Sequence, residues 1–475
     1  MRTVTIIFKS LYSCQHQCGF CHVLYVPRST SYMSTEAVQR TFDAIEARFA
    51  GCRVDLDMSG GEFALRRDAV ELIRYLRTKK IHFSSLVLDT MAVPLADEAL
   101  ARELGALFTK VNVSVHAPDP LVHAQVSASK TDFNDLKAGL IHLFRYFPAV
   151  FTNTSINRYN HDRLRDIARF VLKARSASGR ETPLFCAYYL PVYRHYGEAV
   201  AENQRRLQGA DNADFLPHGS LLGEVREELA RTRALLELHG ASAQLRDFNY
   251  PACVYHRVTG DLPEHAYGLP NFMNDSYFTD YTHPIDEEWS LEEVYPSMYD
   301  RVKDEACASC IAEPTCPGIT REWRRRGYEP VPVEEAAYAA GFPERLINRT
   351  LHGTFFDPIR ISALVDALPI DWAELGRSFF EHLARGEELR SARVRIAALS
   401  PAERARGLIA HLEARGGPGE VALAAAIAEE LAALERLAQQ ASPPARAGRT
   451  TGATGAAPPP RSAPGPAQRR LPLLG

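Results

Sequence analysis

Residues 4–190 alternate short apolar segments with longer amphipathic ones, and this alternation limits the possible folds more than any other feature. Six segments have the length and composition of strands: 4–8, 54–58, 83–88, 111–115, 150–156 and 184–190. Five helical segments lie between them: 35–49, 67–79, 97–107, 134–147 and 162–177, with Ser34 placed to cap the first. Such alternation is typical of a parallel sheet with right-handed crossovers. Six units predict an α/β fold, a partial (β/α)6 TIM-like barrel that falls short of the eight units of a closed barrel.

After the sixth predicted strand, the amino-acid composition and the expected secondary structure change several times along the chain. We assign residues 1–215 to the barrel, and residues 216–330, which are irregular and hold clustered cysteines, to a small second region. Residues 331–441 are rich in Ala, Arg, Glu and Leu and predict a helical C-terminal extension. Residues 442–475 consist mainly of Pro, Gly, Ala and Arg without periodicity, which predicts a disordered tail.

Charge and hydropathy exclude several classes of partner. The net charge is −3, whereas nucleic-acid binding usually requires a basic patch or a high pI. No run of about 20 apolar residues is present, so we expect no membrane partner. The opening segment MRTVTIIFKS has too short an apolar run for a signal peptide. We therefore expect a cytoplasmic protein, in which nine cysteines favour metal binding over disulfides.

The fourth and fifth predicted strands carry polar residues at every second position. These residues are Asn112, Ser114 and His116 in the fourth strand, and Asn153, Ser155 and Asn157 in the fifth. Alternate residues share one face of a strand, so both strands present a polar face to the barrel interior. A packed barrel fills this face with Val, Ile and Leu. The pattern therefore predicts a ligand cavity, although polar strand ends exposed to water would give the same pattern.

Three cysteines follow the first strand in the segment LYSCQHQCGFCH. Cys14, Cys18 and Cys21 have C-x3-C-x2-C spacing. Thiolates are the preferred ligands of iron–sulfur clusters and of zinc. Three thiolates on a four-iron cluster leave one iron open, whereas a structural zinc site takes a fourth ligand, which His16 or His22 would supply. The spacing alone leaves both metals open.

The second strand ends in Gly60, Gly61 and Glu62. Glycines let the backbone approach a ligand closely, and a carboxylate at this end of a parallel barrel can bind an ammonium group. Alone, such a tripeptide is more often a turn. Together with the three cysteines it favours the iron–sulfur interpretation.

The two motifs together resemble the radical S-adenosylmethionine (SAM) superfamily, in which a C-x3-C-x2-C loop follows strand one and Gly-Gly-Glu closes strand two. The resemblance covers roughly residues 4–330. It implies that the three cysteines ligate a [4Fe–4S] cluster whose fourth iron is chelated by the amino and carboxyl groups of SAM. It also implies SAM contacts at Phe20 (adenine), at Gly60, Gly61 and Glu62 (the amino group), and at Ser114 and Asn153 (ribose or carboxylate). Gln15 and Phe63 depart from the Asn and Pro that close relatives often have, which bears on the subfamily.

A second cysteine group lies in the region after the barrel. Cys307, Cys310 and Cys316, with Cys253 upstream, are enough to close one cluster, and zinc would fit the same spacing. The segment from Cys316 to Glu329 is similar to the ending of SPASM and twitch subdomains, which carry auxiliary [4Fe–4S] clusters. A full SPASM domain with two clusters needs more cysteines, so the count favours one auxiliary cluster. Cys52 and Cys186 stand among apolar neighbours and are expected to pack as small hydrophobes.

The resemblance implies a radical SAM enzyme that reductively cleaves SAM to a 5′-deoxyadenosyl radical and abstracts hydrogen from a peptide or small-molecule substrate in natural-product or cofactor biosynthesis. A one-electron reductant such as flavodoxin or ferredoxin would supply the electron. Many peptide-modifying relatives begin with a peptide-binding winged-helix segment; we expect none here, although a separate protein can provide it. The alternative is a non-catalytic zinc or iron–sulfur module with a structural or electron-transfer role, which the polar barrel faces and Gly-Gly-Glu disfavour.

Overall fold

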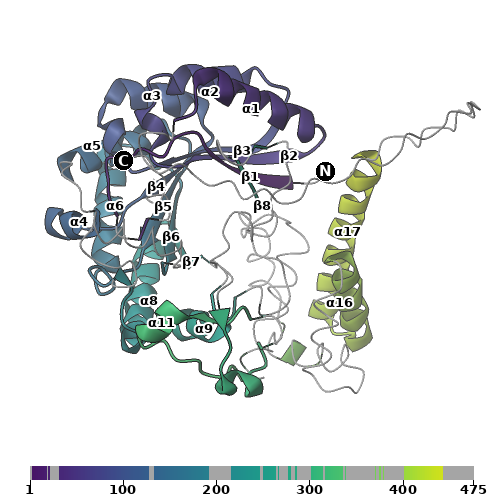
Figure 1. Cartoon of the computed structure of the whole chain (residues 1–475). Coiled ribbons are helices and arrows are strands. Elements are labelled where there is room, and N and C mark those ends of the chain that lie inside the picture. Colours follow the sequence, from purple (N-terminus) through teal and green to yellow (C-terminus); the bar gives the residue numbers. More distant parts are fainter. Residues whose placement is uncertain are drawn as a thin grey trace, which may run out of the picture.

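The structure is a computed structural model, and it describes residues 3–18, 20–21, 32–127, 133–191, 215–246, 250–263, 266, 276–279, 284–285, 301–313, 316–334, 337, 370, 374–375, 378 and 401–441. An eight-stranded parallel sheet, in the order β7-β6-β5-β4-β3-β2-β1-β8, forms the centre of the described part (Figure 1). The predicted tail, 442–475, lies outside the described residues.

The six predicted strands are all present and pair in sequence order. They are β1 (Thr3–Lys9), β2 (Arg53–Ser59), β3 (His82–Thr90), β4 (Lys110–Ser114), β5 (Val150–Ser155) and β6 (Leu184–Tyr189). Their parallel pairing confirms the predicted α/β partial barrel. Two short strands extend the sheet, β7 (Ser242–Leu245) beside β6 and β8 (Ser276–Thr279) beside β1.

Helices cover the outer face of this sheet (Figure 1). The predicted helices are α1 (Thr35–Arg48), α2 (Ala69–Arg77), α3 (Glu98–Leu107), α5 (Phe133–Tyr146) and α6 (Leu164–Ser178). As predicted, Ser34 caps α1, since its side chain accepts a hydrogen bond from Ala37 N at 3.2 Å. A further helix, α4 (Pro120–Ser127), and two 3-10 turns, η2 (Phe63–Leu65) and η3 (Val93–Ala96), follow strand ends.

The two faces of the sheet differ in chemistry. Val54, Leu56 and Met58 of β2 point outward and are fully buried in the core beneath the helices. The alternate residues Asp55 and Asp57 point inward and are only half-buried. The inner face of β2 is therefore polar and half-buried. Of the six polar residues predicted to face the interior from the fourth and fifth strands, Ser114 and Asn153 are half-buried, and the other four are buried.

A smaller region follows the barrel. It comprises η5 (Gly219–Leu221), α8 (Leu222–Leu238), α9 (Ala252–Thr259), the antiparallel pair β9 (Arg301–Val302) and β10 (Ile319–Thr320), η8 (Glu305–Ser309) and α11 (Arg321–Arg325). The predicted helical extension contains α16 (Pro401–Arg415) and α17 (Pro418–Ala441). Leu408, Leu412 and Leu423 of these helices share a hydrophobic core with Ala252 and Cys310, so the extension packs on the smaller region.

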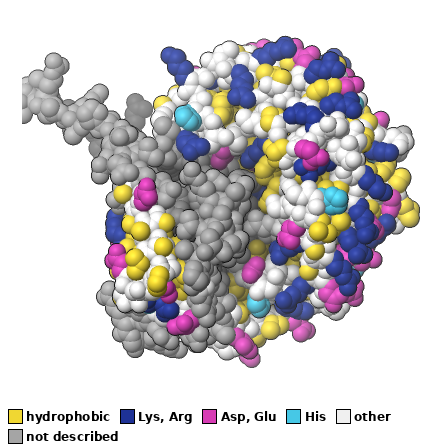
Figure 2. Space-filling view, turned by 180° about the vertical axis from the view of Figure 1, so that it is seen from behind, with side chains coloured by type: hydrophobic (Ala, Val, Ile, Leu, Met, Phe, Trp, Pro, Cys, Tyr) yellow, Lys and Arg dark blue, Asp and Glu magenta, His cyan; other side chains and the backbone are white. Residues whose placement is uncertain are grey.

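The surface drawn in Figure 2 intersperses basic and acidic side chains among apolar ones. Among the helices that the structure describes, none combines the length and hydropathy needed to cross a lipid bilayer.

Candidate active site and auxiliary cysteine site

The loop that leaves β1 gathers Cys14, Cys18 and Cys21. Cys18 is buried and the other two are half-buried. Burial raises the pKa of the Cys18 thiol well above its usual range, and the charges of Cys21 and Cys14 raise it further, so the three sulfurs lie within electrostatic reach of one another. His16 N donates a hydrogen bond to Cys14 Sγ at 3.4 Å. Thiolates brought this close repel one another unless a cation is shared among them, which fits a metal centre.

The end of β2 holds this loop in place. Gly61 N donates to Leu11 O at 2.8 Å, and Glu62 N donates to Ser13 O at 2.9 Å. A Cβ atom at Gly61 would lie 2.5 Å from the Tyr12 carbonyl carbon and would overlap the Ser13 carbonyl oxygen. The glycines were predicted to let the backbone approach a ligand, and in the structure the backbone of the cysteine loop lies against them.

Glu62 has a buried carboxylate with three hydrogen-bond donors. Its Oε1 accepts from Ala64 N at 3.3 Å, and its Oε2 accepts from Thr90 Oγ1 at 3.1 Å and from Met91 N at 2.6 Å. Burial raises the pKa of Glu62 to about 7, against the lowering effect of these donors. A carboxylate offers about four lone-pair sites, so one remains for a further donor such as an ammonium group.

Phe20 lies where the cysteine loop meets α4. Its ring stands edge-on to His116, with ring centroids 4.8 Å apart, and it packs against Val122 and Val126. His116 follows β4, and its Nδ1 accepts a hydrogen bond from Ser155 N at 3.1 Å. Phe20, the predicted adenine contact, therefore packs against the residue that follows β4.

The same loop is also tied to α4 through His16. The His16 and His123 rings meet edge-on at 5.0 Å, and Gln17 N donates to Ser127 O at 2.7 Å. Burial, and then the charge of His123, lower the pKa of His16 to about 4, so this imidazole is neutral at physiological pH. The contacts to α4 on one side and to the end of β2 on the other fix the cysteine loop.

Ser114 and Asn153 lie beside each other on the inner face of β4 and β5, where they are register partners. Both are half-buried, and Asn153 Oδ1 accepts a hydrogen bond from Arg246 Nη1 at 3.4 Å. Asn157, which the sequence placed on the same face, holds the turn after β5 by accepting from Tyr159 N at 2.9 Å and donating to Ser155 O at 3.0 Å.

Charged residues of β2, β3 and the segment after β7 face the interior beside these positions. Asn112 Nδ2 donates to Asp89 Oδ1 at 3.0 Å. Burial, and then the charge of Asp89, raise the pKa of Asp57 to about 7, while Lys110 and Arg246 oppose the rise. The signal for Asp57 is present in the alternation of β2, Val-Asp-Leu-Asp-Met. Arg246 follows β7, which periodicity does not predict.

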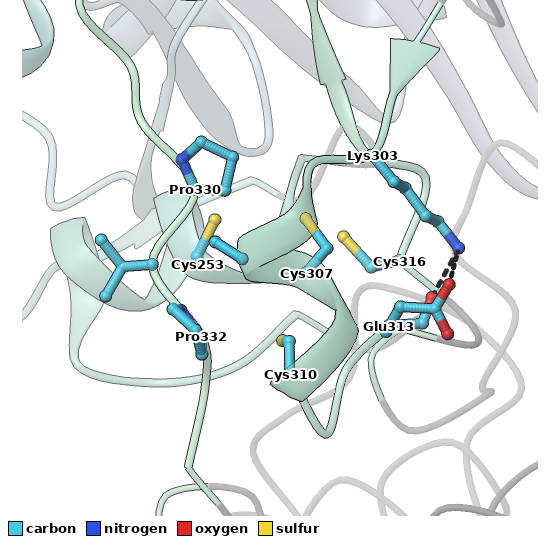
Figure 3. A pocket seen from close by; sticks show the side chains of 10 residues that line it. Cys253, Lys303, Cys307, Cys310, Glu313, Cys316, Pro330 and Pro332 are labelled. Carbon is cyan, nitrogen blue, oxygen red and sulfur yellow. Dashed lines mark hydrogen bonds and ion pairs between the residues drawn. The ribbon is translucent and has the colours of Figure 1, made fainter.

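The four remaining clustered cysteines line one cavity (Figure 3). Cys253 comes from α9, Cys307 from η8, Cys310 from the end of η8, and Cys316 from the approach to β10. The cavity has a volume of about 310 Å³, including the space open to solvent, and the ion pair between Lys303 and Glu313 borders it. Within the described residues, no three Cys, His, Asp or Glu side chains converge at the distance of a single metal ion.

Backbone N–H groups point at every sulfur of this second site. The donors are Val331 N for Cys253, Asp304 N for Cys307 at 3.4 Å, Val333 N for Cys310 at 3.3 Å and Ala252 N for Cys316 at 3.5 Å. Such bonds favour the thiolate form. Burial raises the pKa of the Cys253 thiol to about 11, and the nearby charges of Cys316, Cys310 and Cys307 add to the rise. The sulfur of Cys253 therefore lies within electrostatic reach of the other three sulfurs.

The other two cysteines pack in the barrel core. Cys186 in β6 is buried, and burial raises the pKa of its thiol to about 12. Cys52 is half-buried against the same core. Both match the predicted role of small hydrophobes.

Residues 9–171 match the family model of the Radical SAM superfamily. Among solved structures, SuiB from Streptococcus suis bound to S-adenosylmethionine is 11% identical, with 68% of this chain and 73% of that chain covered and a TM-score of 0.46. Native anSMEcpe with bound AdoMet is 14% identical, with 67% and 89% covered and a TM-score of 0.45. Coproporphyrinogen III oxidase from Escherichia coli is 18% identical, with 50% and 53% covered and a TM-score of 0.36. The matched residues include strands β2 to β5 and both motifs of the first site, so this chain carries a region, residues 9–171, that matches the Radical SAM superfamily.

Proposed function

We propose that this protein is an enzyme that reductively cleaves SAM and uses the resulting 5′-deoxyadenosyl radical to abstract hydrogen from a peptide or small-molecule substrate. The observation that carries the proposal is the gathering of Cys14, Cys18 and Cys21 in a loop that is hydrogen-bonded to the Gly-Gly-Glu segment. These three cysteines would hold a [4Fe–4S] cluster, which would supply the electron for cleavage of the sulfonium C–S bond.

The surrounding residues fit SAM. Glu62 keeps an acceptor site for the ammonium group after its three internal hydrogen bonds. Phe20 offers an aromatic edge for adenine, and Ser114 and Asn153 offer polar groups for the ribose or the carboxylate from the adjacent strands. These residues orient the cofactor, while the buried apolar face of the sheet keeps the strands that bear them rigid.

The interior beyond this site supports a polar substrate. Asp57, Asp89 and Arg246 face it from β2, β3 and the end of β7, and they are half-buried. Similar solved structures include anSMEcpe with a Cp18Cys peptide and anSMEcpe with a Kp18Cys peptide. Both a peptide and a small molecule remain within the proposal.

We further propose one auxiliary [4Fe–4S] cluster in the twitch-like region 216–330, held by Cys253, Cys307, Cys310 and Cys316. A cavity bordered by four interacting thiols suits a multi-iron core. The proposed division of the chain is a barrel over 1–215, this region, and the helical extension 331–441. Cysteines that bind metal suit a reducing cytoplasm, and we propose a reductant such as flavodoxin or ferredoxin.

The test is anaerobic reconstitution followed by dithionite reduction with SAM. We expect 5′-deoxyadenosine by mass spectrometry, and about eight irons and eight sulfides per chain from two four-iron clusters. Cys18→Ala should abolish 5′-deoxyadenosine, whereas Cys52→Ala, a control at a half-buried cysteine outside both sites, should not. One retained zinc in place of iron, with no SAM cleavage, would overturn the proposal.

A further inference from the structure

We infer that the inner face of the barrel binds an alkylammonium group of the substrate, with the carboxylate of Asp57 as its anchor. The inference rests on the proposed function, since it takes this face as the place where the substrate meets the SAM-derived radical. It adds the chemical class of the substrate, which is a primary amine on an apolar stem, as in a lysine side chain or a small alkylamine.

Three carboxylates lie on the inner face of β2 and β3, and their hydrogen bonds differ. Asp55 Oδ1 accepts from Ser85 Oγ at 2.7 Å, and Asp89 Oδ1 accepts from Asn112 Nδ2 at 3.0 Å. Among the hydrogen bonds and ion pairs of the described residues, none involves Asp57, although its side chain is half-buried. The lone pairs of this carboxylate therefore remain available to a donor that the substrate brings.

The strands that carry these carboxylates lead directly into the proposed SAM site. The strand of Asp57, β2, continues into Gly60 of the Gly-Gly-Glu segment. Asp89 directly precedes Thr90, whose Oγ1 donates to Glu62 Oε2 at 3.1 Å. A substrate amine bound by Asp57 would therefore lie next to the bound cofactor, on the side of the barrel interior.

Aromatic rings lie on the same inner face, beyond the carboxylates. Asp89 is the register partner of Asn112, Asn112 of Phe151, and Phe151 of Phe185. Register partners point to one face of a sheet, so both rings face the interior. The two rings are half-buried, with centroids 5.4 Å apart. This face therefore has an acidic side and an apolar side, which suits a cation on an alkyl stem.

The cations of this face do not offset the charge of Asp57. Lys110 and Arg246 lower the pKa of Asp57, yet burial, and then the charge of Asp89, raise it to about 7. A proton thus relieves the charge in part of the free protein, and a substrate ammonium group would relieve it in the complex. Lys110 Nζ lies 5.3 Å from the centroid of Phe151, so this face already accommodates one ammonium group beside an aromatic ring.

The test is calorimetric titration of n-butylamine into oxidised, reconstituted, full-length protein saturated with SAM, at constant ionic strength. We expect n-butylamine to bind, and the uncharged n-butanol not to bind. Asp57→Asn should weaken n-butylamine about tenfold or more, because hydrogen bonds between charged groups are the stronger ones. Asp55→Asn is the matched control, since Asp55 already bonds to Ser85, and its affinity should stay within about twofold of wild type. Tighter binding of N-acetyl-L-lysine methylamide than of n-butylamine would favour a peptide as the source of the amine, and the reverse a small molecule.

A second measurement needs no variant. Wild-type protein should bind n-butylamine about tenfold more tightly than methylamine, because the longer stem buries apolar surface on the rings. Equal affinities of the two amines, or equal affinity of wild type and Asp57→Asn for n-butylamine, would overturn the inference. So would the absence of n-butylamine binding in protein that forms 5′-deoxyadenosine with dithionite, and the proposed function would then still stand. Absence of SAM cleavage itself would refute the proposed function, and the inference with it.

Discussion

Gly61 has no space for a side chain, because the backbone at Tyr12 and Ser13 already occupies it. We expect Gly61→Ala to push the cysteine loop away and to break the Glu62 N to Ser13 O hydrogen bond. Overpacking of this kind typically costs about 1–3 kcal/mol. The variant should lose iron from the first site, measured as iron and sulfide per chain after reconstitution, with a lowered Tm.

Gly223 offers the matched control, since it lies in helix α8 with nothing within 4 Å of an added Cβ. Gly223→Ala should retain all iron and gain up to about 1 kcal/mol, because alanine is the better helix former. Full iron content in Gly61→Ala would show that the glycine is needed only for SAM binding and not for the position of the cysteine loop.

The Glu62 carboxylate should make SAM binding depend on pH. Its pKa of about 7 in the free protein means that about one carboxylate in eleven is ionised at pH 6 and about half at pH 7. Only the ionised form attracts the SAM ammonium group, so Kd should fall about fivefold as the pH rises from 6 to 7. Calorimetric titration of oxidised, reconstituted protein measures this without SAM cleavage.

Glu62→Gln should weaken SAM binding at pH 7 and remove this dependence while iron content stays unchanged. The amide is isosteric and carries no charge over the whole range. An equal pH slope in the variant would place the titrating group elsewhere, and a loss of iron would show that the carboxylate serves mainly the cysteine loop.

The clustered cysteines and the 60–62 tripeptide could be proposed from the sequence because their signal is local, whereas Arg246 could not. Cysteine spacing and the 60–62 tripeptide are visible in a few consecutive residues. The space at Gly61 is filled by Tyr12 and Ser13, which are distant in sequence, so only the fold reveals what approaches it. Arg246 reaches the interior because β7 pairs with β6, and no local pattern encodes that pairing.

At the scale of elements, α9 and the 301–333 segment meet at the cysteines and also share two hydrophobic cores. A cluster shared by Cys253, Cys307, Cys310 and Cys316 would bind these elements together, since metal binding contributes directly to folding free energy. Cys253→Ala should therefore reduce hydrogen-exchange protection in η8 and β9 while β1 to β6 stay protected. Unchanged protection in η8 would mean that packing alone holds the segment.

The elements themselves differed in how well they could be predicted. Strands β1 to β6 and their helices were recognisable because each is long enough to show its period, and β2 buries every second residue. Strands β7 and β8 have four residues each, too few to show a period, and they form only by pairing with strands distant in sequence.

At the scale of the whole molecule, the two sites draw on separate parts of the chain. All residues proposed for the first site lie between Cys14 and Asn153, and all ligands of the second lie between Cys253 and Cys316. Cys310→Ala should therefore still form 5′-deoxyadenosine with dithionite, yet give little product from the true substrate. Loss of both reactions, with the first cluster confirmed by EPR, would contradict this separation, and so would full product formation.

The core that Cys310 shares with Leu408, Leu412 and Leu423 has a consequence for the order in which the protein matures. During synthesis the N-terminal parts of a chain fold first. The strands and the cysteine loop of the first site are complete long before α16 and α17 leave the ribosome. The surroundings of Cys310 close only when these last helices arrive. A nascent chain could thus receive its first cluster while the second site is still open, and the two iron–sulfur insertions would follow each other in time.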